Sequence, residues 1–323
     1  MPPIIRPRAL QPGDTIAIAA LSGQIETVDL EMYQRGVSEL ESMGFKVRAA
    51  PLVGVEHVWW WAAAKPAEVA AEVNDLFRDP EVRAIWGLAG GRFALSYLDG
   101  LDYDAIAANP KPIIGMSDLV VPILAIHSRT GLVTFHADGL MYGVTEWQDL
   151  APDDRVRQAD AYRRVLTSTT AIGRLPALSK WETWRAGRAE GPLLGGLLQR
   201  FIRIQATPWA FAPERFDGAI LFLEDLGRPT IDVWNDLHVL RYSGAFERIA
   251  GLLVGPTETI SVMPEAPMSL RQAVLDVVGD RDIPIIANVN LGHAGPNLPL
   301  PLGVRAAIDA EALTLDLVEG AVS

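Results

Sequence analysis

Ser117 occupies a position where a serine could act as a nucleophile. It follows the apolar run Ile113–Gly115, which is typical of a buried strand, and precedes Leu119–Ser128, which has the pattern of a helix. A sharp turn between strand and helix lifts a hydroxyl out of the sheet, and the helix N-terminus stabilises negative charge on a bound carbonyl. The alternative is that Ser117 or Asp118 only caps this helix, because both residue types favour such positions. The full Gly-x-Ser-x-Gly pattern is not met, because position 119 is leucine.

A serine nucleophile needs a histidine or another base within reach. The chain has five histidines, and His293 is the preferred base because it lies between glycines in a loop after a buried strand. Loops on a rigid frame often present such polar side chains to a cleft. His136, in Thr-Phe-His-Ala-Asp, is the alternative cleft residue. His57, His127 and His238 are expected to have structural roles.

The acid that would orient the base is Glu224. This residue ends the apolar run Gly-Ala-Ile-Leu-Phe-Leu-Glu-Asp, so a predicted strand finishes on a carboxylate. A buried carboxylate is costly unless it has a partner, and a histidine imidazolium would be a suitable one. The alternative is that Glu224 or Asp225 simply begins a solvated loop.

Gly90 and Gly91 follow the predicted strand 84–88. Paired glycines permit a close approach of the backbone, so an N–H group here could form an oxyanion hole together with the amide of Asp118. As a phosphate loop the pair is weak, because neither the dinucleotide pattern nor a Walker lysine is present.

The elements that must position these residues alternate between strand and helix. Predicted strands cover residues 14–20, 46–49, 84–88, 113–115, 219–223, 249–254, 284–287, 305–309 and 312–318, and predicted helices 30–40, 67–77, 119–128, 233–243 and 269–278. This alternation predicts parallel sheets covered by helices. The fold class is therefore α/β, with an N-terminal flavodoxin-like domain, a C-terminal α/β domain and the active site at their interface.

The predicted domain boundaries follow from a break in this alternation. Between about residues 142 and 187 the sequence carries many charges and no clear strand. We therefore assign 1–145 to the N-terminal domain with the nucleophile, 146–190 to a linker and substrate loop, and 191–323 to the C-terminal domain with the base and acid.

Composition narrows the possible classes of protein. The 323 residues include 40 acidic and 28 basic side chains, for a net charge of -12, and no basic patch stands out, so a nucleic-acid partner is not expected. Because the chain has no cysteine, disulfides, thiolate metal ligands and a cysteine nucleophile are excluded. No leader or membrane segment is recognised, and a cytoplasmic protein with no membrane partner is expected.

The motifs occur in an order that resembles the LD-carboxypeptidase family of serine peptidases, which includes the microcin C immunity peptidases. The order is strand-Gly-Gly, Leu-Asp-Tyr-Asp-x-Ile-x-x-Asn-Pro-Lys-Pro-Ile-Ile-Gly-Met-Ser-Asp, Thr-Phe-His, Leu-Phe-Leu-Glu-Asp, and Gly-His followed by Leu-Pro-Leu-Gly. The resemblance implies a triad of Ser117, Glu224 and His293 split across the two domains. It also implies oxyanion donors at Gly90 or Gly91 and Asp118.

The same resemblance implies what the protein works on. Family members remove a C-terminal amino acid from cell-wall tetrapeptides during peptidoglycan recycling, or cleave an aminoacyl group from a nucleotide-like toxin, a form of antibiotic resistance. They need no metal or other cofactor and are homodimers. The expected partner is thus a small peptide or aminoacyl conjugate, and the alternative is a homologue that binds ligand without catalysis.

Some positions depart from the family pattern. Ala137 and Asp138 stand where relatives have Gly-Pro after the histidine, and Leu197 stands where they have asparagine. These positions are expected to face the substrate, so they leave the triad plausible and the substrate open. Arg92 and His136 are further predicted substrate contacts.

Tryptophans are the remaining candidates for substrate contact. Trp59, Trp60 and Trp61 are consecutive and cannot all face one core, so at least one is expected to be exposed or to contact a partner subunit. Trp181 and Trp184 lie where relatives of the immunity type stack a nucleobase. The alternative for all five is packing or a dimer contact.

Overall fold

The computed structural model describes residues 2–23, 30–54, 59–256 and 267–323, so the predicted structural role of His57 lies outside the described residues. The helices are α1 (Leu30–Ser42), α2 (Pro66–Arg78), α3 (Tyr103–Ala108), α4 (Val120–Thr130), α5 (Pro152–Thr167), α6 (Leu198–Gln205), α7 (Thr230–Tyr242) and α8 (Leu270–Val278). Short 3-10 helices are η1 (Ala94–Gly100), η2 (Ser117–Leu119), η3 (Val144–Asp149) and η4 (Pro213–Phe216). The strands are β1 (Thr15–Ala19), β2 (Lys46–Ala49), β3 (Val82–Gly87), β4 (Ile113–Gly115), β5 (Phe135–His136), β6 (Gly173–Arg174), β7 (Glu182–Arg185), β8 (Arg188–Leu197), β9 (Ile220–Glu224), β10 (Gly251–Val254), β11 (Ile285–Ala287), β12 (Leu300–Pro301), β13 (Arg305–Asp309) and β14 (Thr314–Leu317).

The N-terminal sheet has the order β12-β5-β4-β3-β1-β2. Strands β1 to β5 are parallel, and their 2-1-3-4-5 order is the predicted flavodoxin-like arrangement. The strand order reverses between β1 and β3, and folds of this kind bind ligands in the crevice at that point. The loops after β1 and β3, and the neighbouring loop after β4, therefore lie where a site is expected.

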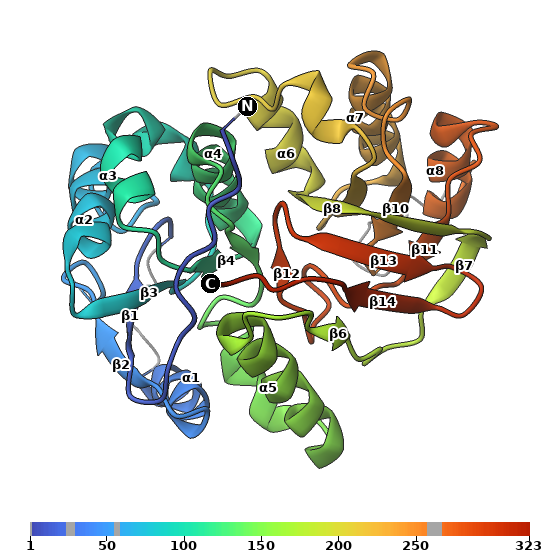
Figure 1. Cartoon of the computed structure of the whole chain (residues 1–323). Coiled ribbons are helices and arrows are strands. Elements are labelled where there is room, and N and C mark those ends of the chain that lie inside the picture. The colour runs from blue at the N-terminus through green and yellow to red at the C-terminus, as the bar shows by residue number, and fades with distance from the viewer. Residues whose placement is uncertain (1, 24–29, 55–58, 257–266) are drawn as a thin grey trace.

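Helix α4 joins the two halves of the molecule. It contacts β4 and β5 on one side and α6 on the other, and almost all of its residues are buried. A helix that is apolar all round is typical of such a buried position. Figure 1 shows α4 next to the second half, with α2 and α3 beyond it and α1 and α5 across the sheet.

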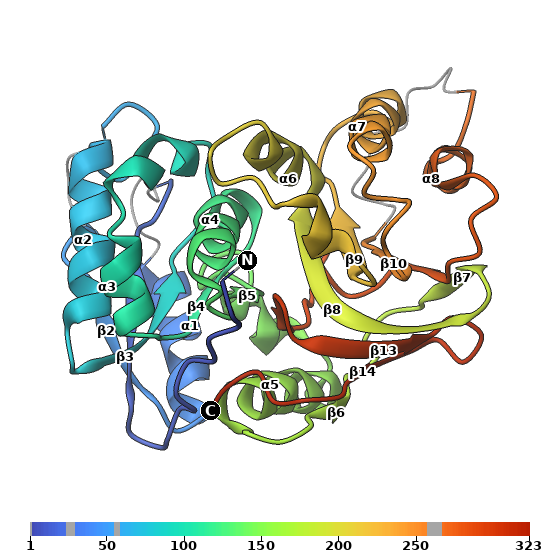
Figure 2. The ribbon, with the colours of Figure 1, turned by 45° about the horizontal axis from the view of Figure 1, so that its top comes forward.

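The second sheet has the order β6-β14-β13-β8-β9-β10-β11-β7. The long strand β8 serves two parts of it, because residues 188–192 pair antiparallel with β13 and residues 193–197 pair parallel with β9. Helices α6, α7 and α8 lie together beside the parallel part (Figure 2). Glu224 thus ends a central, fully buried strand, as predicted.

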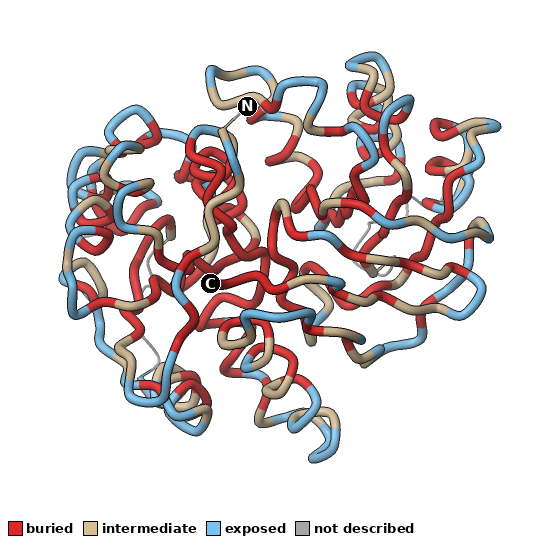
Figure 3. The backbone as a smooth tube through the Cα atoms, in the orientation of Figure 1, coloured by how far each residue is buried: buried red, intermediate tan, exposed pale blue. Residues whose placement is uncertain are grey.

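The chain returns to the first sheet near its end. Strand β12 pairs antiparallel with β5, with Leu300 opposite His136. The last residue also pairs with the start of the chain, because Ser323 exchanges backbone hydrogen bonds of 2.9 Å with Pro7 and Ala9. One hydrophobic cluster extends through both halves, and Figure 3 shows the buried residues concentrated along both sheets and between them.

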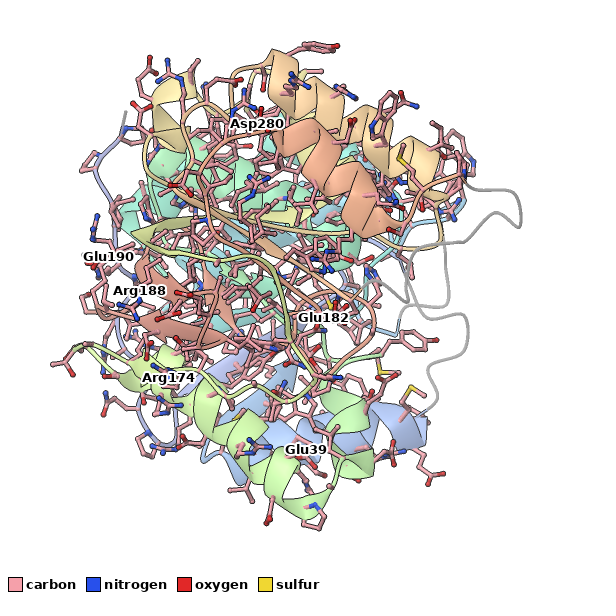
Figure 4. The ribbon with its side chains drawn as sticks, turned by 90° about the vertical axis from the view of Figure 1, so that its right-hand side faces the viewer. Glu39, Arg174, Glu182, Arg188, Glu190 and Asp280 are labelled. Carbon is pink, nitrogen blue, oxygen red and sulfur yellow. The ribbon has the colours of Figure 1, made fainter. Side chains whose placement is uncertain are left out.

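The prediction of no clear strand between about residues 142 and 187 is wrong. This stretch holds α5, β6 and β7, and the last two belong to the second sheet. Helix α5 was missed because its charged residues hide a single buried face, made by Gln158, Ala161, Tyr162, Val165 and Leu166. Arg155 of α5 forms an ion pair with the buried Glu39 of α1, and Figure 4 shows Glu39 where these two helices meet.

Local signals explain where several helices begin and end. Helix α2 starts with Pro66, whose fixed φ suits the first helical position, and the Glu68 carboxylate accepts a hydrogen bond from the Lys65 amide at 2.9 Å. Helix α4 ends at Gly131, which adopts a left-handed φ of 76°. Within the described ranges, none of the helices has both the length and the apolar character needed to cross a membrane.

Candidate active site

Ser117 lies on a strained turn between β4 and α4. Its φ is 61°, in the left-handed region that non-glycine residues rarely adopt. Such a conformation costs on the order of 1–3 kcal/mol and is found at functional sites. The residues around Ser117 are buried while Ser117 itself is half-buried, so the turn presents the hydroxyl as a nucleophile elbow would.

Gly90 lies directly against Ser117. A Cβ atom built on Gly90 would be 2.7 Å from Ser117 Oγ and 3.6 Å from the Asp118 amide nitrogen. The predicted oxyanion residues are therefore close together in space. The Asp118 N–H belongs to the first residues of a helical turn, which have no acceptor within the helix.

The peptide bond between Gly90 and Gly91 is held in a fixed orientation. The Gly90 carbonyl accepts a hydrogen bond of 2.9 Å from the Gly23 amide. Since the C=O and N–H of a trans peptide point in opposite directions, the Gly91 N–H points away from Gly23. It donates to no other residue in the described part of the chain, so it is available to a bound oxyanion.

We expect Gly90→Ala to lower kcat roughly 10²- to 10³-fold, the effect of losing one oxyanion donor. The added methyl group would clash with Ser117 Oγ and would push the Gly90–Gly91 peptide out of place. Steady-state kinetics on purified, folded protein measures the effect. Gly218→Ala is the control for backbone strain. Its φ of 67° makes alanine costly for stability, but no atom lies within 4 Å of the added Cβ, so the site is not displaced. Equal kcat values for the two variants would contradict the assignment.

The side chain of Asp118 has a role that sequence reasoning did not predict. It is buried, and its Oδ2 accepts hydrogen bonds from Ser22 Oγ, Phe93 N and Ala94 N at 2.6, 2.6 and 2.7 Å. Ser22 lies in the loop after β1, and Phe93 and Ala94 lie where the loop after β3 leads into η1. One carboxylate thus ties the glycine loop to the residue that follows the nucleophile.

Arg200 connects this cluster to the second half of the molecule. Its Nε donates to Asp118 Oδ1 at 2.6 Å, and its Nη2 donates to the Gly91 carbonyl at 3.2 Å. Arg200 belongs to α6 and is itself buried. The buried ion pair between Asp118 and Arg200 therefore fixes both sides of the oxyanion loop relative to the second sheet.

Glu224 and His293 meet as predicted. Glu224 Oε2 lies 2.9 Å from His293 Nδ1, and the Glu224 side chain is almost completely buried. Gly292 makes this contact possible, because its φ is 98° and a Cβ at that position would be 2.6 Å from Glu224 Oε2. The glycine before the histidine is thus required by the close approach of loop and strand.

The negative charge of Glu224 changes the pKa of His293. Burial lowers the pKa of His293, but the hydrogen bond and negative charge of Glu224 outweigh burial, and the pKa is raised above its ordinary value. Because Nδ1 faces Glu224, Nε2 is the ring nitrogen left to exchange a proton with substrate or nucleophile. In the described part of the chain no hydrogen bond joins Ser117 to His293; catalytic hydrogen bonds are often long before substrate binds.

His136 does not face a cleft, contrary to the prediction. It is fully buried in β5, between β4 and β12, and its ring packs edge-on against Phe222 with 5.3 Å between centroids. Burial lowers its pKa to about 3, so the ring is neutral. Strand β12 covers β5 on this side, and the pairing of a strand so much later in the chain could not be foreseen.

Trp181 and Trp184 are buried, so their predicted contact with substrate has no support in the structure. Trp181 Nε1 donates to Asn290 Oδ1 at 2.8 Å, and Trp184 Nε1 donates to Glu182 Oε2 at 3.2 Å. Asn290 also accepts from the amides of two residues near Trp181. The Trp181 ring thus holds the segment before the edge strand β7 against the loop that leads to His293, whereas the Trp184 hydrogen bond stays within β7.

The remaining predicted positions differ in how far they are exposed. Trp60 and Trp61 are 69% and 63% exposed, which confirms that the three tryptophans do not share one core. Arg92 is exposed next to the glycine pair, and its contact with substrate stays a prediction. Leu197, expected to face the substrate, is buried in β8 beside Glu224, its partner in the ladder. Asp138, for which the same was expected, is almost fully buried but belongs to the lining of the cavity beside His293.

A cavity of about 490 Å³ opens beside His293. Trp147 and Leu150 give it an apolar wall, Glu146 and Asp149 contribute carboxylates, and Pro296 belongs to the same loop as His293. Within the described ranges, no three His, Asp or Glu side chains gather in an arrangement that could hold a metal ion.

Comparison with protein families gives two matches in the order of the two sheets. Residues 16–137 match the LD-carboxypeptidase N-terminal domain, and residues 190–308 match the LD-carboxypeptidase C-terminal domain. The first match contains Ser117 and the glycine pair, and the second contains Glu224 and His293.

Individual relatives match over nearly their whole length. The chain is 28% identical to the microcin C7 self-immunity protein MccF of Escherichia coli, over 95% of this chain and 94% of that protein. It is also 28% identical to a probable murein peptide carboxypeptidase of Bacillus subtilis, over 98% and 95% of the two chains. The structure of MccF in complex with glutamyl sulfamoyl guanosine superposes with a TM-score of 0.87 at 26% identity, covering 98% of this chain and 99% of that one.

Proposed function

Because this chain belongs to the LD-carboxypeptidase family, we propose that it is a serine-type carboxypeptidase in which Ser117, His293 and Glu224 form the triad. The observation that carries the proposal is the hydrogen bond between Glu224 and His293. Both residues belong to the second half of the molecule. Arg200 of the same half donates a hydrogen bond to the side chain of Asp118, the residue after Ser117. A strained serine, an oriented histidine and a buried carboxylate are the three parts that acyl transfer needs.

In the proposed mechanism His293 Nε2 accepts the proton of the Ser117 hydroxyl while Oγ attacks the substrate carbonyl carbon. The oxygen becomes negatively charged and is bound by the N–H groups of Gly91 and Asp118. The C–N bond then breaks, and His293 gives its proton to the departing amine. Water attacks the acyl enzyme through the same steps and releases the acid and free Ser117. Glu224 holds the imidazole and stabilises its charged form.

The substrate we propose is an L,D-peptide that loses its C-terminal residue, as in muropeptide recycling. The murein peptide carboxypeptidase relative supports this class. The second candidate is an aminoacyl conjugate of a nucleotide-like toxin, and the ligands of MccF, glutamyl sulfamoyl guanosine and aspartyl sulfamoyl adenosine, favour it. A cytoplasmic location and a homodimeric state stay predictions, as does the alternative of an inactive binding homologue.

A direct comparison of the two substrate classes tests this proposal. Purified protein is incubated with a muropeptide tetrapeptide or with an aminoacyl sulfamoyl nucleoside, and products are followed by mass spectrometry. We expect release of the C-terminal amino acid from the tetrapeptide, and none with Ser117→Ala. Cleavage of only the nucleoside conjugate would assign the second candidate. Tight binding without turnover of either compound would favour a binding protein.

A further inference from the structure

Asp138 is a buried carboxylate that the proposed triad does not use. It follows β5 directly and is 1% exposed. Its amide donates to the Tyr162 hydroxyl at 2.8 Å, and its carbonyl accepts from Trp86 Nε1 at 2.8 Å. The backbone of Asp138 is thus fixed on both sides by side chains of the N-terminal half and α5.

The carboxylate of Asp138 is surrounded by neutral donors. Oδ2 accepts from Trp147 Nε1 at 2.8 Å and from Gln158 Nε2 at 3.2 Å, and Oδ1 accepts from Asn297 Nδ2 at 2.6 Å. Burial raises the pKa of Asp138 to about 6, although these hydrogen bonds oppose the shift. A buried carboxylate without a cationic partner is costly, so its presence here calls for a role.

Asn297 links Asp138 to the loop that carries His293. It lies four residues after the histidine, and its backbone carbonyl accepts from Gln158 Nε2 at 2.6 Å. Its Nδ2 also lies 3.3 Å from the sulfur of Met116, the residue before the nucleophile. The chain then continues into β12, which adds to the N-terminal sheet.

The His293 loop therefore has two anchors on different halves of the molecule. On the side of the second sheet, His293 is bound to Glu224, and the Asn290 carbonyl accepts from the Leu298 amide at 2.8 Å. On the N-terminal side, Asn297 is bound to Asp138 next to Met116. Between the anchors only Ala294, Gly295 and Pro296 remain, and they line the cavity beside His293.

We propose that Asp138 is a positioning residue, which acts through Asn297 to hold the His293 loop against the N-terminal half so that the imidazole faces Ser117. This inference rests on the proposed triad. The contact between Asp138 and Asn297 would keep His293, in the second half, at a fixed distance from Ser117, in the first half. A misplacement of about 1 Å at such a site can cost roughly 10²-fold in rate.

Three variants test the proposal: Asp138→Ala, Asn297→Ala and the double variant. Each single change is expected to lower kcat roughly 10- to 10²-fold with little effect on KM, because the reacting groups are misaligned while the bound substrate is not. The kcat of the double variant is expected to be no lower than that of the more impaired single variant, because both residues act through one contact. If Asp138→Ala does not fold, Asp138→Asn, which keeps the shape of the side chain, replaces it in these measurements.

Thr130→Val is the matched control. It removes a buried hydrogen bond of 2.7 Å to the Ile126 carbonyl, at the end of α4 away from Ser117, so it should lower Tm and keep kcat within about 2-fold. Hydrogen exchange of the peptide that covers residues 292–298 is measured alongside and needs no substrate. Faster exchange is expected in both alanine variants and not in the control.

The two readouts separate this inference from the proposed function. Unchanged exchange and unchanged kcat in an active enzyme would overturn the role of Asp138 alone. Multiplying losses in the double variant would also overturn it, since the residues would then act independently. If the wild type hydrolyses nothing, the proposed function fails, and the exchange measurement still decides whether Asp138 holds the loop.

Discussion

Ser117→Ala is expected to lower kcat by roughly 10⁴- to 10⁶-fold, the range found when the nucleophile of a serine triad is removed. Alanine keeps the size of the side chain and removes only the attacking oxygen. The fold should survive, because alanine and serine adopt the left-handed φ of this turn at similar cost. Residual activity would come from the oxyanion donors and substrate binding alone.

Ser128→Ala provides the control for this variant. Ser128 lies near the other end of α4 and its hydroxyl donates to the Ala210 carbonyl at 3.2 Å. Its loss should leave kcat and KM nearly unchanged. Turnover of Ser117→Ala at more than about a tenth of the wild-type rate would show that another group is the nucleophile.

Glu224→Gln is the second large effect that we expect, with kcat lowered roughly 10³- to 10⁴-fold. The amide keeps the shape of Glu224 but cannot stabilise the imidazolium, and it favours the wrong tautomer of His293. The pH dependence must change as well. Because the Glu224 charge raises the pKa of His293, removing it lowers that pKa.

The direction of the pH change follows from the form of histidine that acts as base. Only the neutral imidazole can accept a proton from Ser117, so kcat/KM rises as the pH rises through the pKa of His293. In Glu224→Gln this rise should occur at lower pH than in the wild type. Glu190→Gln is the control, because Glu190 is an exposed partner of Arg305, and its profile should be unchanged. A Glu224→Gln profile that keeps the wild-type midpoint would contradict the coupling.

The sequence was sufficient for the parts of the fold that have a clear local signal. Strand-end motifs located Ser117, Glu224 and the glycine pair, because a buried strand that finishes on a polar residue is a local pattern. The parallel direction of the strands in the first sheet followed from the alternation of predicted strands and helices. Helix α5 was missed, since its apolar positions are separated by many charges, and β12 was missed because a two-residue strand has no periodicity.

The parts of the site that could not be predicted depend on contacts between distant residues. The Asp118 carboxylate binds Ser22, Phe93 and Arg200, and nothing near Asp118 in the sequence indicates those partners. Asp138 was expected to face the substrate and does line the cavity beside His293, but its hydrogen bonds to Asn297 and Trp147 were not predicted. A polar residue after a strand gives the same sequence signal whether it lines a cleft or anchors a loop.

The central claim is that Ser117 is an activated nucleophile, and covalent labelling tests it most directly. In this reaction Ser117 Oγ attacks the phosphorus of a fluorophosphonate, fluoride leaves, and His293 takes the serine proton. We predict one adduct per chain on Ser117 in the folded protein, with much slower labelling in Glu224→Gln. No adduct in folded protein, or an adduct on another serine, would contradict the account.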